Sequence, residues 1–170
     1  MYTPENYNHN RHWSDRFLPQ VMKVLSFGKA DVRITPFWQD VKEAADLKIL
    51  ADSQDEEDIY AAVRLRKSSY ASRYPFEFTV RYKYTAGYKT EYEKIMEGYA
   101  DIMFYGFVIG KNVARWIMLD MDVFRAEAEE DYISKEHKYN ADGRNSFLAF
   151  DVRSFKSDII LSNSEGYFDV

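Results

Sequence analysis

The stretch GYKTEYEKIMEGYADIMFYGF, residues 87–107, decides the fold because it joins a charged helix directly to an apolar strand. Thr90 and Glu93 have the spacing of a capping box, which favours a helix start at this point. Gly98 suits a left-handed helix end, and the residues that follow, DIMFYGFVI (101–109), are apolar on both faces. Such a strand is typical of the middle of a covered sheet. The stretch therefore predicts a helix packed beside the central strand of a mixed sheet.

The apolar side chains of this predicted helix mark its buried side. They recur at helical spacing and are Tyr92, Ile95, Met96 and Tyr99. Glu91 lies at the edge of this stripe, one turn from Lys94, so both residues border the polar face. Beyond the central strand, the turn GKN and the segment ARWIMLDMDVF (114–124) predict the second strand of a hairpin.

The flanking segments predict one further helix and several strands. The expected elements are a helix between Ser14 and Gly28, a short strand ended by Pro36, a strand over 45–50, and alternating strands over 60–67 and 76–84. Both alternating strands have an apolar face and a basic face, so we expect them to be neighbours in one sheet. Residues 146–152 and 158–162 predict an added hairpin at the sheet edge.

Length and composition favour a single domain over residues 1–170. The chain has 170 residues, of which 46% are hydrophobic, which is enough for a substantial core. The expected fold is α+β or α/β, with a mixed central sheet flanked by helices and a β-rich C-terminal extension. No membrane-span or signal-peptide pattern is present, so we expect a cytoplasmic protein without a membrane partner. The absence of cysteine excludes disulfides, thiol nucleophiles and thiolate metal sites.

The net charge of −5 does not exclude a polyanionic partner, because two acidic clusters carry much of it. The clusters are Asp52, Asp55, Glu56, Glu57 and Asp58, and then Glu127, Glu129, Glu130 and Asp131. Without these nine acids, 19 of the 28 acidic residues remain against 23 basic residues. The rest of the chain is therefore mildly basic.

The polar face of the predicted sheet is the leading candidate for a functional site. Its charged residues are Asp46, Lys48, Arg64, Arg66, Glu77, Arg81 and Lys83, and Glu91 reaches toward them from the helix. A metal-dependent phosphodiesterase needs carboxylates to hold Mg²⁺ and a lysine or arginine to neutralise phosphate. A solvated outer face has the same alternation of charge, and that alternative is open.

The order of the predicted elements resembles the core of the PD-(D/E)xK nuclease superfamily, the restriction-endonuclease-like fold. ADLKIL (45–50) matches the strand with the first acid, Asp46, and AAVRLRK (61–67) matches the strand with the acid-x-lysine pair. This chain has Arg64 and Arg66 in place of that pair. The resemblance implies that Glu91 supplies the second acid, so that Asp46 and Glu91 bind Mg²⁺, with Lys94 or Arg66 as the catalytic cation.

Other arrangements of the acids remain open at this point. Asp46 and Lys48 are an alternative pair, which needs an earlier acid, namely Asp31, Asp40 or Glu43. Asp120 and Asp122 lie on one side of a predicted strand and form another candidate cation site. A degenerate, inactive nuclease fold is equally consistent with the sequence.

Nucleic-acid contacts are expected from the basic strands and from one connection. Arg64, Arg66 and Arg81, with Lys83 nearby, are candidates to bind phosphodiester groups. The segment SSYASRYPF (68–76) is expected to be an exposed connection that offers Tyr70 and Arg73 for stacking and charge contacts.

Residues 45–125 also resemble small uncharacterised proteins of bacteriophages and related mobile elements. Three functional hypotheses follow, and one of them is a structural or assembly protein of the phage particle. The first is a metal-dependent phage-type nuclease relative, active or degenerate, in the host cytoplasm. The alternative is a non-enzymatic phage-encoded protein that binds a host defence or nucleic-acid-processing complex through its acidic clusters and aromatic loops.

Overall fold

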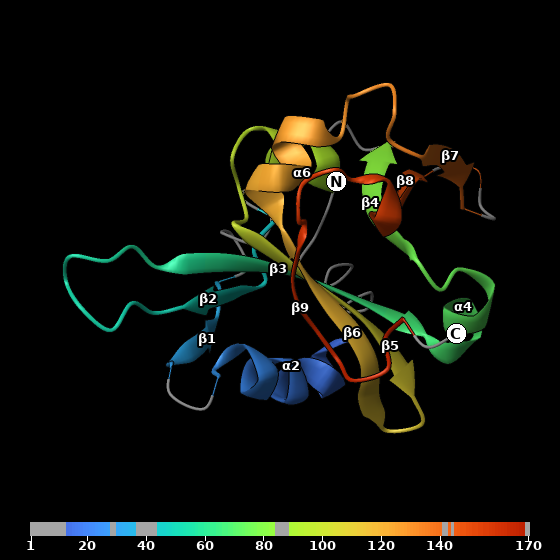
Figure 1. Cartoon of the computed structure of the whole chain (residues 1–170). Coiled ribbons are helices and arrows are strands. Elements are labelled where there is room, and N and C mark those ends of the chain that lie inside the picture. Colours follow the sequence, from blue (N-terminus) through green and yellow to red (C-terminus); the bar gives the residue numbers. More distant parts are fainter. Residues whose placement is uncertain are drawn as a thin grey trace.

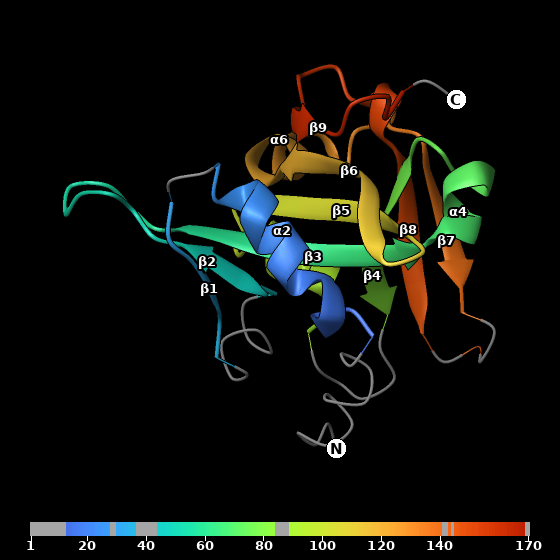
Figure 2. The same ribbon diagram turned by 90° about the horizontal axis from the view of Figure 1, so that it is seen from below.

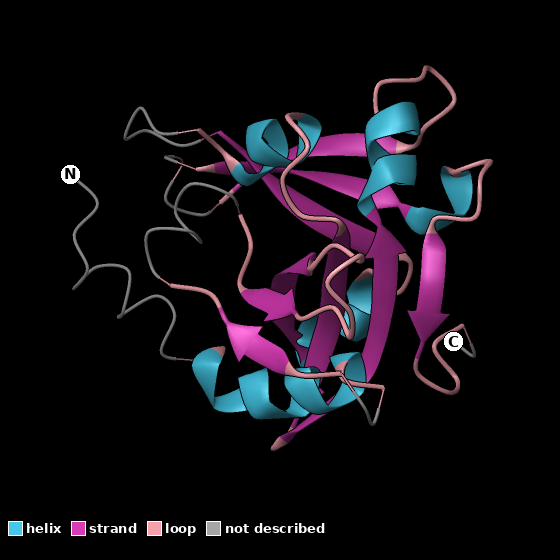
Figure 3. Cartoon of the chain, turned by 90° about the vertical axis from the view of Figure 1, so that its left-hand side faces the viewer, coloured by secondary structure: helices cyan, strands magenta, loops and turns pink. Residues whose placement is uncertain are grey.

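Two β-sheets form the frame of the molecule (Figure 1), in a computed structural model that describes residues 13–27, 30–36, 44–83, 89–140, 143 and 145–168. The larger sheet has six strands in the order β1-β2-β3-β5-β6-β9, and the smaller has the order β4-β8-β7. Figure 3 shows most of the helices at the periphery of these strands. The mixed α+β class is therefore confirmed.

The six-stranded sheet is mixed, as expected. Its strands are β1 (Val32–Ile34), β2 (Leu47–Ile49), β3 (Ile59–Lys67), β5 (Ile102–Ile109), β6 (Asn112–Asp120) and β9 (Ile160–Asn163). Strand β3 is antiparallel to β2 and parallel to β5, and β5 forms the predicted hairpin with β6. Seven consecutive β5 residues, Ile102 to Val108, are buried. The strand that is apolar on both faces is therefore an inner strand of this sheet.

The three-stranded sheet contradicts two expectations about strand pairing. Its strands are β4 (Glu77–Lys83), β7 (Lys135–Tyr139) and β8 (Ser146–Asp151). Strands β3 and β4 are not neighbours, because β3 pairs with β2 and β5 while β4 pairs with β8. The expected C-terminal hairpin is also wrong, because β8 and β9 belong to different sheets. Alternation identifies the two faces of a strand and leaves its pairing partner undetermined.

The helices are short. They are the 3₁₀ segments η1 (Asp15–Phe17) and η2 (Val152–Ser154), and the α-helices α2 (Leu18–Leu25), α4 (Ser68–Arg73), α5 (Glu91–Met96) and α6 (Met121–Glu127). The capping box of Thr90 and Glu93 is confirmed at the start of α5. Tyr99 lies beyond the end of α5 and is 40% exposed, so its assignment to the buried stripe is wrong. Within the described residues, no helix has the length and apolar character needed to cross a membrane.

Two apolar cores lie on the two faces of the large sheet. Helix α2 crosses one face (Figure 2), where Leu18, Val21 and Leu25 pack with Leu47 and Phe104. The opposite face packs against the small sheet and helices α5 and α6, and there the fully buried aromatic residues are Phe78, Phe107, Phe124, Phe150 and Tyr167. We expected helices to flank the sheet, and on this side a second sheet also covers much of it.

Glu127, from the second acidic cluster, is buried rather than solvated. It lies at the end of α6 and is 7% exposed. Its carboxylate accepts hydrogen bonds from the amides of Lys156 and Ser157 at 2.8 and 2.9 Å, and from the hydroxyl of Tyr132 at 3.1 Å. Hydrogen bonds from Ser157 and from the Lys156 amide lower the pKa of Glu127 to about 2. The charged carboxylate therefore links α6 to the segment that leads into β9.

Glu127→Gln should lower the melting temperature by several degrees at pH 7. All the partners of this carboxylate donate hydrogen bonds, and the NH₂ group of a glutamine side chain cannot accept them. The pKa of Glu127 is lowered on folding, so its charge stabilises the fold above the ordinary pKa of 4.5 and that stability is lost as the pH falls toward 2. The difference between wild type and variant should therefore shrink in melting curves recorded from pH 7 to acid. Glu130→Gln, at an exposed acid nearby, is the control. A difference that does not change with pH would contradict this role.

Candidate nucleic-acid interface

The second half of β3 presents two arginines to the space between the sheets. Val63 and Leu65 pack against the core beneath α2, so alternation turns Arg64 and Arg66 to the opposite face. Ala62, on the same face as the arginines, belongs to the core between the sheets. The predicted basic face of this strand is therefore turned inward, toward the small sheet.

Arg64 forms an ion pair with Glu91. The guanidinium Nη1 of Arg64 donates to Glu91 Oε2 at 3.0 Å, and the backbone amide of Arg81 donates to the same oxygen at 2.9 Å. Both charged side chains are only 17% exposed. Three predicted residues from β3, β4 and α5 thus meet at one carboxylate, although β3 and β4 belong to different sheets.

Arg66 lies close to this ion pair but has different surroundings. Its guanidinium carbon is 4.4 Å from the ring centroid of Tyr70 and 5.9 Å from that of Phe147. Its Nε is buried and has no hydrogen-bond partner within the described part of the chain. Among the described residues no carboxylate is within ion-pair distance of Arg66. Phe147 is the cross-strand neighbour of Arg81, so Arg66 also packs where the two sheets approach each other.

Asp46, the expected first acid, has a structural contact in the large sheet. Its Oδ2 accepts the amide of Val63 at 2.7 Å, and its own amide donates to the carbonyl of Ala61 at 3.0 Å. These contacts extend the pairing of β2 with β3 by one residue. Glu91 instead accepts hydrogen bonds from the guanidinium of Arg64 and the amide of Arg81. In the described ranges, no group of three or more histidine or acidic residues is placed to hold a metal ion, so Mg²⁺ at Asp46 and Glu91 stays a prediction.

The remaining predicted residues are distributed around the arginines. Lys94 is half-buried on α5, while Arg73 and Lys83 are exposed. The predicted exposed connection is the helix α4, and its Tyr70 is 39% exposed while it packs on Arg66.

The alternative acid–lysine arrangement uses residues that pair elsewhere. Lys48 pairs with Asp58 at 2.6 Å, and Asp31 pairs with Arg33 at 2.7 Å. Asp40 and Glu43, the other two candidate acids, lie outside the described residues. Among the residues that the structure describes, Lys48 has no ion pair with Asp46.

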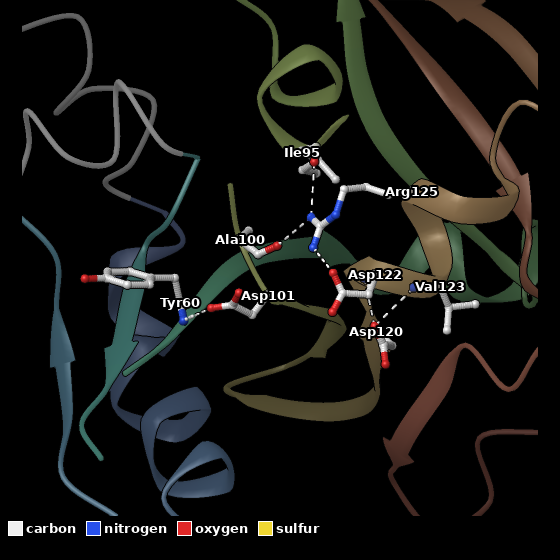
Figure 4. A network of polar contacts seen from close by, with 8 residues as sticks. All are labelled: Tyr60, Ile95, Ala100, Asp101, Asp120, Asp122, Val123 and Arg125. Carbon is white, nitrogen blue, oxygen red and sulfur yellow. Dashed lines mark hydrogen bonds and ion pairs between the residues drawn. The ribbon is translucent and has the colours of Figure 1, made fainter. Parts of the chain in front are cut away.

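The acids at the end of β6 are engaged in local structure (Figure 4). Asp120 caps α6, because its carboxylate accepts hydrogen bonds from the backbone amides of Asp122 and Val123 at 2.8 and 3.2 Å. Asp122 pairs with Arg125, whose guanidinium also donates to two backbone carbonyls. Asp101 accepts the amide of Tyr60 at 2.7 Å. The expected strand 114–124 therefore ends at Asp120, and the carboxylates of Asp120 and Asp122 stabilise the junction of β6 with α6.

Comparisons with known proteins add no identity: no family model, no curated protein and no solved structure matches the chain. The site therefore has to be interpreted from its own residues. Sequence reasoning missed Phe147 and Lys138, because their strands were not expected beside β3. Residues 135–139, KEHKY, have no apolar alternation that predicts a strand, and the apolar run in 146–151 predicts a strand without revealing what it faces.

Proposed function

We propose that this chain is a nucleic-acid-binding protein with a nuclease-like core, in which Arg64, Arg66 and Arg81 contact the phosphodiester backbone. The observation that carries this proposal is Arg66. It is a cation held between aromatic rings at the junction of the sheets, and the described residues give it no carboxylate partner. A buried or half-buried arginine without a counter-charge is costly, and an anionic ligand offsets that cost.

The order of elements supports the nuclease-like part of the proposal. Helix α2, strands β1, β2 and β3, helix α5 and strand β5 occur in this order along the chain, with α4 and β4 between β3 and α5, and β5 lies parallel to β3. This order resembles that of the PD-(D/E)xK superfamily core. Asp46, the residue that matches the first acid, directly precedes β2. The chain departs from the superfamily pattern in two ways. It has Arg64 and Arg66 on β3 in place of the acid–lysine pair, and it has a second sheet, whose strand β4 lies between β3 and β5 in the sequence.

The separation of charge along β3 also supports a polyanionic ligand. The loop before β3 carries the exposed acids Asp52, Asp55, Glu56 and Glu57 and projects away from the sheets (Figures 1 and 2). At about 3.3 Å per residue, the length of β3 places this loop roughly 20 Å from Arg66. That distance exceeds the Debye length of about 8 Å at physiological salt. These acids therefore do little to weaken the attraction between the arginines and an anionic ligand.

Binding rather than cleavage is the activity that the carboxylate contacts favour. Asp46 accepts a strand amide, and Glu91 neutralises Arg64 while it also accepts the Arg81 amide. Both residues thus have a structural role that accounts for them without a metal. The proposed protein is a degenerate relative in which the basic residues remain functional.

Arg66→Met should weaken the binding of labelled DNA or RNA oligonucleotides by about tenfold, since it removes one charged phosphate contact. In fluorescence anisotropy between about 50 and 200 mM salt, the slope of log K against log salt should fall by roughly 0.7 to 1. Arg153→Met is the matched control, because Arg153 also packs on a ring, that of Phe76 at 4.0 Å, but is neutralised by Asp151 at 2.6 Å.

Two outcomes would overturn this proposal. One is the absence of binding to every single-stranded and double-stranded DNA and RNA tested. The other is cleavage by the wild type with Mg²⁺ or Mn²⁺ that Asp46→Ala, purified identically, no longer shows. That second result would restore the metal-dependent nuclease.

A further inference from the structure

A pocket opens beside Arg66 between the two sheets. Its volume is about 370 Å³, within the range of about 300 to 1,000 Å³ that is typical of small-ligand sites. Strands β3, β4, β5, β7 and β8 and helix α4 all contribute to its wall. The residues that matter for the argument are Arg66, Thr79, Tyr105, Tyr70, Tyr74 and Tyr139.

The inner wall of the pocket is polar but incompletely satisfied. Thr79 is 5% exposed, and its hydroxyl lies beside that of Tyr105. The buried Nε of Arg66 has no hydrogen-bond partner in the described part of the structure. Tyr105 is 2% exposed, and burial raises the pKa of its hydroxyl, which therefore stays protonated. Buried polar groups in proteins nearly always have partners, so the unpartnered Nε of Arg66 indicates a polar ligand.

The pocket wall holds two cations and two acids, Glu77 and Glu136, and the way they pair leaves one cation for an anionic group of the ligand. Lys138 is the second cation of the wall, and it pairs with Glu77 at 3.1 Å and with Glu136 at 3.0 Å. Of the two, only Arg66 lacks a carboxylate partner among the residues described. Tyr70 and Phe147 hold its guanidinium from the ring side, so its N–H edge is left to bind the anion.

The rim of the pocket is aromatic and exposed. Tyr70, Tyr74 and Tyr139 are 39%, 38% and 60% exposed. Exposed tyrosines around a cation are the usual platform for bases of single-stranded nucleic acid, because each base has a face that stacks. A base inside a duplex is already stacked between its neighbours and does not reach such a rim.

We propose that this pocket binds one unstacked nucleotide of a single strand, with its phosphate on Arg66 and its base against the rim tyrosines. This inference rests on the proposed function and names its substrate class, single-stranded nucleic acid. The inner wall offers the hydroxyls of Thr79 and Tyr105, which both donate and accept hydrogen bonds, and stacking does not depend on base identity. The binding is therefore tolerant of sequence.

The test compares three probes with the full chain in fluorescence anisotropy: a short single strand, its duplex, and the same single strand with abasic sites. The wild type should bind the intact single strand about tenfold or more tightly than the other two. Tyr74→Leu with Tyr139→Leu should remove about tenfold or more of that affinity and bring it close to the affinity for the duplex. Tyr99→Leu, at a tyrosine that is 40% exposed elsewhere, is the matched control.

Failure of this inference is distinguishable from failure of the proposed function. Equal affinity for the three probes, or full single-strand affinity in the tyrosine variant, would overturn the inference and leave nucleic-acid binding in place. Loss of affinity in the tyrosine variant with none in Arg66→Met would overturn the placement of the phosphate. No binding to any probe would overturn both. Circular dichroism melting of each variant shows that a loss of affinity is not a loss of fold.

Discussion

Glu91→Ala is expected to lower the free energy of unfolding by about 3 kcal/mol, because it leaves Arg64 as a half-buried charge without its partner. The amide of Arg81 would lose its acceptor as well. Both members of the ion pair are only 17% exposed, so solvent does little to replace the lost contact. Urea titration followed by circular dichroism measures the change.

Two further variants make the result specific to the ion pair. Glu97→Ala removes an exposed acid that pairs with Lys89 just past α5, and it should cost well under about 1 kcal/mol. The double variant Arg64→Met with Glu91→Leu removes both charges and should recover much of the stability lost in Glu91→Ala. If Glu91→Ala were as stable as the wild type, Glu91 would be free for another role, and the metal-binding assignment would regain support.

Phe124→Ala should be at least as damaging, with a loss of about 3 to 5 kcal/mol. Phe124 is fully buried on α6, and its ring centroid lies 5.8 Å from that of Phe78 and 5.0 Å from that of Phe150. It also meets Tyr92 of α5 at 6.2 Å. The substitution therefore opens a cavity at the place where the small sheet, α5 and α6 converge.

The controls for Phe124 separate cavity formation from the loss of any aromatic ring. Phe124→Leu fills part of the space and should cost clearly less than Phe124→Ala. Phe27→Ala removes a ring that is 66% exposed and should change the stability by less than about 0.5 kcal/mol. A loss below about 1 kcal/mol for Phe124→Ala in urea titrations would show that this cluster does not hold the small sheet in place.

Three of the residues expected on one polar face lie together in the structure, although the expected strand pairing is wrong. Arg64, Arg81 and Glu91 were expected to meet on the polar face of one sheet, and they do meet. They do so across two sheets, in an interior junction, and Glu91 serves as a counter-charge to Arg64. Asp46 was expected beside them, but its carboxylate accepts the backbone amide of Val63 on β3.

The sequence by itself determined the features that depend on residues close together in the chain. The capping box at Thr90 is made by groups three residues apart, and the hairpin of β5 and β6 is closed by a two-residue turn. Alternation likewise determined which side chains of β3 share a face. Only the tertiary structure decided that β4 leaves the sheet of β3, that β8 and β9 separate, and that Phe147 packs on Arg66. The reason is physical: an apolar strand face is buried equally well by any complementary surface, so the choice among distant partners is settled by the packing of the whole core.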